Sequence, residues 1–153
     1  MTFSRVSVQT QVFDVAERYA SLASNSSAGA VVTFVGHVRD MNLGQTIQSL
    51  ELEHYPGMTE KVLEQINLEA IERFDINGLD VVHRVGVLDV NEAIVFVGVS
   101  SAHRGDAFQA CEFVMDALKT RAPFWKKEQG SDNTAWVSHR DSDSQAVERW
   151  AKK

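Results

Sequence analysis

The order of apolar and polar positions predicts a mixture of strands and helices. Runs of apolar residues, or strict apolar–polar alternation, indicate strands over residues 29–35, 50–54, 79–88, 93–101 and 135–137. Helices are expected over residues 14–23, 59–74 and 106–120 and near Trp150, with Asp14 and Thr59 as N-caps. Residues 89–92 would join two strands as an antiparallel hairpin, and residues 40–44 and 128–134 have loop composition. The pattern favours an α+β fold.

The helix expected over residues 106–120 has the clearest apolar face. Phe108, Cys111, Met115 and Leu118 follow the spacing of a stripe that packs on a core. Lys119 falls about 20° from Phe108 around the helix axis, so it is expected to project from the apolar side. A lysine in a last turn ordinarily reaches water and favours the helix dipole. Here more cations and two aromatic residues follow at once, an environment that suits acid–base or nucleophilic work.

Composition narrows the class of protein. The chain has 153 residues, which we expect to form one domain over residues 1–153. Its net charge of -6 argues against a nucleic-acid or membrane-surface protein, and no apolar run is long enough for a membrane span. One cysteine and an N-terminus unlike a signal peptide favour a reducing compartment, with the cytoplasm expected.

A local basic cluster interrupts this acidic chain. Residues 102–127 contain five Lys or Arg against three Asp or Glu. His103 and Arg104 precede the first turn of the expected helix, where free backbone N–H groups favour an anion. Arg39 follows the strand over residues 29–35, at the start of a loop where ligand contacts are common. An ordinary solvated surface would have the same composition, so charge alone does not decide.

Five strings, in order, resemble the large subunits of molybdopterin synthase. They are Phe34-Val-Gly-His-Val-Arg39, Leu52-Glu-His-Tyr-Pro-Gly-Met58, His83-Arg-Val-Gly86, Ser100-Ser-Ala-His-Arg104 and Lys119-Thr-Arg-Ala-Pro-Phe-Trp-Lys-Lys-Glu128. The resemblance implies an α+β fold of the α/β-hammerhead type, with an antiparallel sheet and packed helices. It implies a homodimer within a heterotetramer, each large subunit binding a small ubiquitin-like sulfur carrier whose C-terminal glycine is a thiocarboxylate. The implied reaction adds two sulfurs to cyclic pyranopterin monophosphate and forms the dithiolene of molybdopterin.

The same resemblance implies roles for individual residues. The active-site lysines would be Lys119 and Lys126. The residues expected to bind the substrate are Arg39, His103, Arg104, Lys127, Glu128 and His37. Arginine and a helix N-terminus suit a phosphate, and a lysine near a thiocarboxylate would stabilise developing negative charge.

No metal or other cofactor is expected, because the five histidines lack close ligand spacing and one cysteine makes a thiolate zinc site unfavourable. Two alternatives remain open from the residues alone. Cys111 would carry a persulfide in a different kind of sulfurtransferase, although its place on the apolar stripe favours an inert thiol. The basic cluster would otherwise belong to a non-catalytic module for an anion or a protein tail, or for single-stranded RNA stacked on Phe124 and Trp125.

Overall fold

The main sheet has four strands and carries most of the core. The computed structural model describes residues 2–42, 44–130, 134–136 and 141–151. The strand order is β1 (Phe3–Gln9), β5 (Gly78–Arg84), β7 (Ala93–Ser101) and β2 (Ala30–His37). The pairs β5–β7 and β7–β2 are antiparallel, whereas β1 runs parallel to β5. The expected α+β class with packed helices is confirmed, with one parallel pair in a sheet that was expected to be antiparallel throughout.

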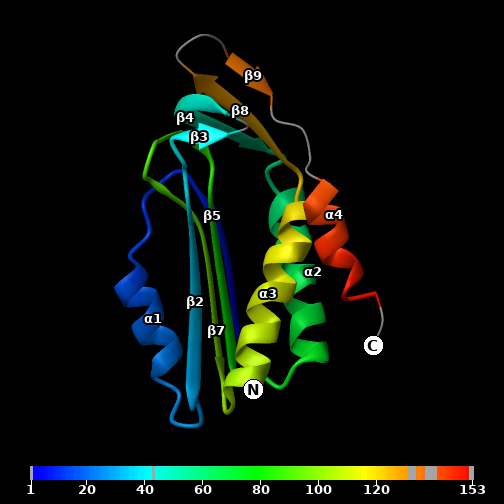
Figure 1. Ribbon diagram of the computed structural model, residues 1–153. Helices are drawn as coiled ribbons and strands as arrows, with labels where there is room; N and C mark the ends of the chain where they lie inside the picture. Colours follow the sequence, from blue (N-terminus) through cyan, green and yellow to red (C-terminus); the bar gives the residue numbers. More distant parts are fainter. Residues whose placement is uncertain (1, 43, 131–133, 137–140, 152–153) are drawn as a thin grey trace.

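Helices cover both faces of this sheet. Figure 1 shows α1 (Val15–Ala23) on one face and α2 (Met58–Arg73) with α3 (Arg104–Arg121) on the other. The largest apolar cluster lies between α2, α3 and the strands. The helix α4 (Asp141–Glu148) packs against α3, and the Nε1 of Trp150 donates to Asp116 at 2.7 Å. None of the helices in the described ranges has the length and apolar character that a membrane span requires.

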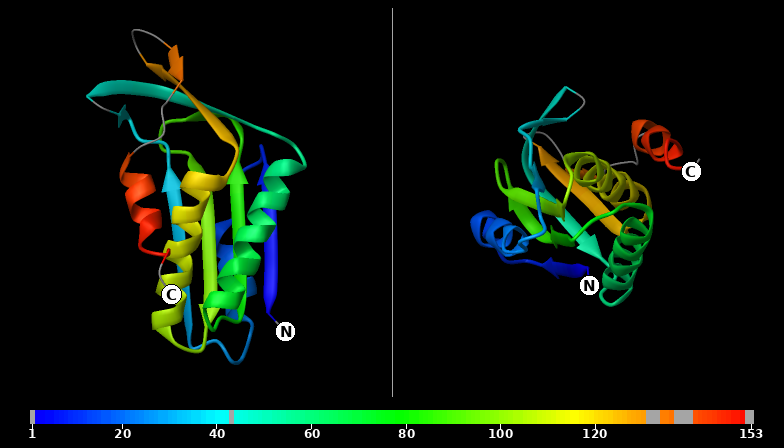
Figure 2. Two further views of the ribbon diagram at one scale, coloured as in Figure 1. Left: turned by 90° about the vertical axis from the view of Figure 1, so that its right-hand side faces the viewer. Right: turned by 90° about the horizontal axis from the view of Figure 1, so that it is seen from below.

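A second, smaller sheet crosses one end of the first. It contains β3 (Met41–Asn42), β4 (Gln45–His54), β6 (Gly86–Asp89), β8 (Phe124–Gly130) and β9 (Thr134–Trp136). Figure 2 shows β4 and β8 lying across the end at which α3 finishes. A separate apolar cluster beneath this sheet is formed by Val38, Leu50, Leu52, Val85 and Leu88.

The expected strand over residues 79–88 is wrong as a single element. The chain leaves the main sheet after Arg84, and β6 pairs with β4 in the second sheet. Gly86 makes this possible because its φ of 91° lies in the left-handed region that side chains disfavour. The antiparallel pairing of β5 with β7 is confirmed, but the turn at residues 89–92 connects β6 to β7.

Of the two expected helix N-caps, one is confirmed and the other is wrong. Asp14 does cap α1, accepting from the backbone N of Glu17 at 3.2 Å. Thr59 does not cap α2, which starts one residue earlier after Gly57. The backbone N of Gly57 donates to Glu60 instead, and the Thr59 hydroxyl is buried and donates to the Tyr55 carbonyl.

The apolar stripe expected on α3 is only partly right. Cys111 and Leu118 are buried, but Met115 is half-buried and Phe108 is 61% exposed. The face that packs on the sheet consists mostly of small residues: Ala107, Ala110, Cys111, Phe113, Val114, Ala117 and Leu118. Lys119 accordingly lies on the exposed side of the helix, and the expectation that it leaves from the core face is wrong.

The loop expected over residues 128–134 is also wrong where the structure describes it. Glu128 belongs to β8, and Thr134 begins β9, the strand expected over residues 135–137. Residues 131–133 and 137 lie outside the described residues. The loop expected over 40–44 contains the short strand β3, and Leu43 is likewise not described.

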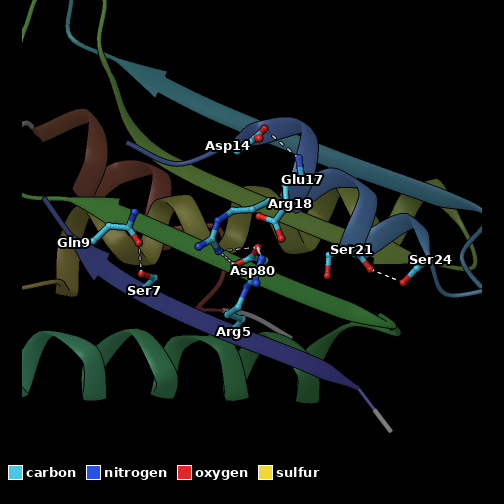
Figure 3. A network of polar contacts seen from close by, with 9 residues as sticks. All are labelled: Arg5, Ser7, Gln9, Asp14, Glu17, Arg18, Ser21, Ser24 and Asp80. Carbon is cyan, nitrogen blue, oxygen red and sulfur yellow. Dashed lines mark hydrogen bonds and ion pairs between the residues drawn. The ribbon is translucent and has the colours of Figure 1, made fainter. Parts of the chain in front are cut away.

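A buried carboxylate joins α1 to the main sheet. Asp80 on β5 is fully buried, and its oxygens accept from Arg18 of α1 at 2.8 and 3.0 Å and from Arg5 of β1 at 2.8 Å (Figure 3). The hydrogen bond from Arg5 to Asp80 raises the pKa of Arg5 above its ordinary value. One carboxylate therefore holds two strands and a helix together, away from the basic residues of the second sheet.

Candidate functional site

Two lysines lie on either side of the connection from α3 to β8. Lys119 lies in the last turn of α3, which has its C-cap at Ala122, and Lys126 lies on β8. In the β4–β8 pairing Lys126 is opposite Leu52, which is buried, so Lys126 belongs to the strand face that covers the second apolar cluster. Alternation places Lys127 on the other face, opposite Glu51. The structure therefore separates Lys127 from Lys126.

A buried histidine, His83, lies near both lysines. The His83 ring stacks on Phe124 with centroids 3.8 Å apart and an interplanar angle of 17°. Burial lowers the pKa of His83 to about 3, the hydrogen bond with the Arg84 carbonyl opposes this, and the charges of Lys126 and Lys119 lower it further. Both lysine charges thus act on one neutral imidazole ring, which places Lys119, Lys126 and His83 in one neighbourhood.

Glu128 is held by a residue of β3, on the far side of β4. The Asn42 amide donates to both carboxylate oxygens of Glu128 at 2.9 Å. Glu128 lies opposite the buried Leu50 and therefore shares a strand face with Lys126. The carboxylate and the lysine are thus placed by the same β4–β8 register.

Arg39 lies at the same end of the molecule. It is exposed in the short segment between β2 and β3, and Val38 beside it exchanges backbone hydrogen bonds with Asn91 and Glu92. His37 ends β2, and its Nδ1 lies 2.9 Å from the Asn91 carbonyl, which makes this nitrogen the donor. These contacts fix the backbone around Arg39 against the turn before β7.

His103 and Arg104 lie at the opposite end. His103 is the N-cap of α3 and Arg104 its first residue, and both are exposed. Fifteen residues separate Arg104 from Lys119, which is about 22 Å along a helix that rises about 1.5 Å per residue. Figure 1 shows the start of α3 at the far end from β4 and β8. Within one chain, the structure does not bring His103 and Arg104 to the lysines.

Cys111 has the properties of a structural thiol. Its side chain is 6% exposed, and burial raises its pKa to about 11. A persulfide carrier needs an accessible thiolate, which this environment disfavours. Within the described ranges, no group of three or more His, Cys, Asp or Glu is arranged to hold a metal ion.

Comparison with known proteins decides the family. A model described as MoaE protein matches residues 8–121, which is more than half of the chain. The chain belongs to the MoaE family. A molybdopterin synthase catalytic subunit from Vibrio cholerae is 59% identical over 146 residues, covering 95% of this chain and 97% of the relative.

Solved structures agree with this assignment. Molybdopterin cofactor biosynthesis protein E from Burkholderia multivorans has a TM-score of 0.82 at 50% identity, covering 99% of each chain. Molybdopterin synthase from Staphylococcus aureus has a TM-score of 0.82 at 35% identity, covering 87% of this chain and 96% of that one. Membership of the MoaE family confirms the expected sulfur-transferring enzyme of molybdenum cofactor biosynthesis.

Sequence reasoning missed the imidazole rings around the lysines. Phe124 was expected near Lys119 as one of the two aromatic residues that follow the helix, but neither His54 nor His83 was expected there. Their signal was present, because two of the five strings contain a histidine without a stated role. What the sequence lacked was the path of β8, which brings Phe124 onto His83.

Proposed function

We propose that this chain transfers sulfur from the C-terminal thiocarboxylate of a small ubiquitin-like partner to cyclic pyranopterin monophosphate, forming the molybdopterin dithiolene. The observation that supports it most is that Lys119 and Lys126 both act electrostatically on the buried His83, in a chain of the MoaE family. Both reactants are anions, one through its phosphate and one through its thiocarboxylate. Ammonium groups at one place stabilise both, and they also stabilise the oxyanion that develops as sulfur is transferred.

The place of each expected site residue in the structure indicates its role. Lys119 and Lys126 act at the reacting atoms, with Glu128 held beside Lys126 by Asn42. Arg39 and His37 lie at the same end, where they contribute to binding the substrate. Lys127 projects from the opposite strand face and extends the basic surface toward the bound partner. We propose that the reaction uses no metal or other cofactor.

A second copy of the chain completes the site. His103 and Arg104 are expected to bind the phosphate, yet they lie about 22 Å from Lys119 along α3. If two α3 helices lie antiparallel about a two-fold axis near their midpoints, Arg104 of each copy approaches Lys119 of the other. The exposed Phe108 on α3 and Phe34 on the edge strand β2 supply apolar surface for such a contact. The working form is therefore a homodimer, with one small subunit bound to each copy.

The test is complementation between two variants. Lys119→Ala and Arg104→Ala should each show strongly reduced dithiolene formation with the thiocarboxylated partner and the cyclic pterin. When the two chains are co-refolded in equal amounts, half of the dimers are mixed and each contains one intact site, so about one quarter of the parent activity should return. A site built within one chain would recover nothing. A parent protein that makes no dithiolene would refute the proposed function itself.

We also propose that residues 1–153 act as one domain in the cytoplasm. Val8 and Ile94 pack against both the main cluster and the cluster beneath the second sheet, which supports one continuous unit. The buried, unpaired Cys111 suits a reducing compartment. Limited proteolysis that released a stable fragment would contradict the single domain.

A further inference from the structure

Two of the family strings contain residues to which the proposed function gives no role. Residues 52–58 include His54, and residues 83–86 begin with His83. The structure brings both imidazole rings to Phe124, the first residue of β8. A buried histidine with no part in binding or chemistry calls for a physical account, because an apolar residue would fill the same space at lower cost.

Hydrogen bonds fix the tautomer and orientation of each ring. The Nδ1 of His83 lies 2.9 Å from the Arg84 carbonyl, which only accepts, so this nitrogen has the hydrogen. The Thr59 hydroxyl donates to the Tyr55 carbonyl at 2.8 Å, which leaves its oxygen to accept from the Nδ1 of His54 at 3.1 Å. Phe124 thus lies against one tightly stacked ring and a second, tilted ring whose centroid is 6.2 Å away.

The position of Phe124 controls both lysines. The backbone N of Ala122 still donates to Leu118, and the N of Phe124 donates to Ala122 at 2.9 Å, so β8 starts directly from the end of α3. Lys126 follows Phe124 by two residues on the same strand face, and Lys119 lies in the last turn before the connection. A shift of Phe124 would therefore move the two amines relative to each other.

We propose that His83 is a positioning residue for this reaction: its ring, stacked on Phe124, holds Phe124 in place and so sets the spacing of Lys119 and Lys126. The inference rests on the proposed function. The charged and titratable groups that act on the ring are Lys126, Lys119 and His54, and each of them disfavours an imidazolium. A third positive charge beside the two lysines would oppose their placement, which explains why the ring is buried and neutral. His83 itself does not reach the reacting atoms in this account.

The experiment compares two substitutions at one position. His83→Ala removes the stack, whereas His83→Phe keeps an uncharged aromatic ring against Phe124. Misplaced reacting groups slow the reaction of the bound substrate more than they weaken its binding. In His83→Ala, kcat should therefore fall about ten- to hundredfold, whereas KM for the pterin should change less than about threefold. His83→Phe should recover most of the kcat. Phe13→Leu is the matched control, because it removes the buried Phe13–Phe96 contact of a separate cluster and should leave kcat unchanged.

A second readout does not depend on turnover. The acetylation rate of Lys126 by acetic anhydride, followed by mass spectrometry, should change at least about threefold in His83→Ala and return toward the parent rate in His83→Phe. If His83→Ala does not fold, Phe124→Leu breaks the same stack from the other side and should reproduce both effects. Parent kcat and parent Lys126 reactivity in a folded His83→Ala protein would overturn the inference, as would a His83→Phe variant as impaired as His83→Ala. An inactive parent would refute the proposed function alone, since the acetylation comparison would still decide the role of His83.

Discussion

The neutral state of His83 should make this protein lose stability as the pH falls through a defined range. The pKa of His83 is lowered from 6.5 to about 3 in the folded chain, chiefly by burial. Below pH 6.5 the unfolded chain therefore binds a proton at His83 that the folded chain does not bind. The stability due to the neutral ring is fully present above about pH 6.5 and is lost as the pH falls toward about 3.

The magnitude follows from linkage. Each pH unit between the two pKa values contributes about 1.4 kcal/mol, so between about pH 7.5 and about pH 4.5 the free energy of unfolding should fall by about 2.7 kcal/mol through His83. His83→Phe has no group to titrate and should lack this part of the loss. Urea unfolding followed by tryptophan fluorescence, for both proteins at both pH values, measures the difference. Every other residue is the same in the two proteins, so the comparison isolates position 83.

Equal losses of stability in the two proteins would refute the reasoning. They would mean that His83 accepts a proton in the folded state, and hence that its ring is hydrated and not enclosed between Phe124 and its own strand. The stack would then be too loose to set the spacing of the lysines. A parent protein that loses about 2.7 kcal/mol more than His83→Phe would establish the buried, neutral ring in solution.

Substitutions at three other positions test separate features. Asp80→Asn should lower the free energy of unfolding by about 3 kcal/mol in urea, because Arg5 and Arg18 lose their buried counter-charge; an unchanged midpoint would contradict this. Cys111→Ala should cost about 1 kcal/mol yet keep its turnover with the thiocarboxylated partner, and lost turnover in a folded variant would favour a persulfide mechanism. Lys119→Ala should lose most dithiolene formation at an unchanged melting temperature, and Lys119→Arg should restore little because guanidinium does not release its proton. Full activity in Lys119→Ala would transfer the leading role to another residue.

Local signals in the sequence predicted most helices and one antiparallel pair of the main sheet, β5 with β7. The Asp14 cap and the end of the helix expected over residues 106–120 depend on neighbouring residues only. Both predictions are confirmed, with α3 ending at Arg121. The face of α3 was misread because spacing rules give most weight to large apolar side chains such as Phe108. The sheet instead packs against alanines, which allow close approach of the helix, and a pattern search cannot distinguish such a face from a neutral one.

Long-range pairing explains the remaining differences. The polar segment from Glu128 to Gly130 resembles a loop, and only its register with β4 makes it a strand. The apolar run over residues 79–88 resembles one strand, and only the left-handed Gly86 and a second sheet divide it. For the same reason, the sequence indicated Lys119 and Lys126 but not the His83–Phe124 stack near them, because that contact joins residues 41 positions apart.

The proposed function constrains the length of α3 more tightly than the residue types at its exposed positions. Residues expected to act on one substrate lie in its first turn and its last, so the length of the helix sets the distance between them in the proposed dimer. Insertion of one residue would lengthen it by about 1.5 Å and rotate one end by about 100° relative to the other. Exposed positions along its middle can therefore accept many side chains, whereas an insertion or deletion there would misalign both sites at once. Among functional relatives, variation in this helix should take the form of substitution and not of changed length.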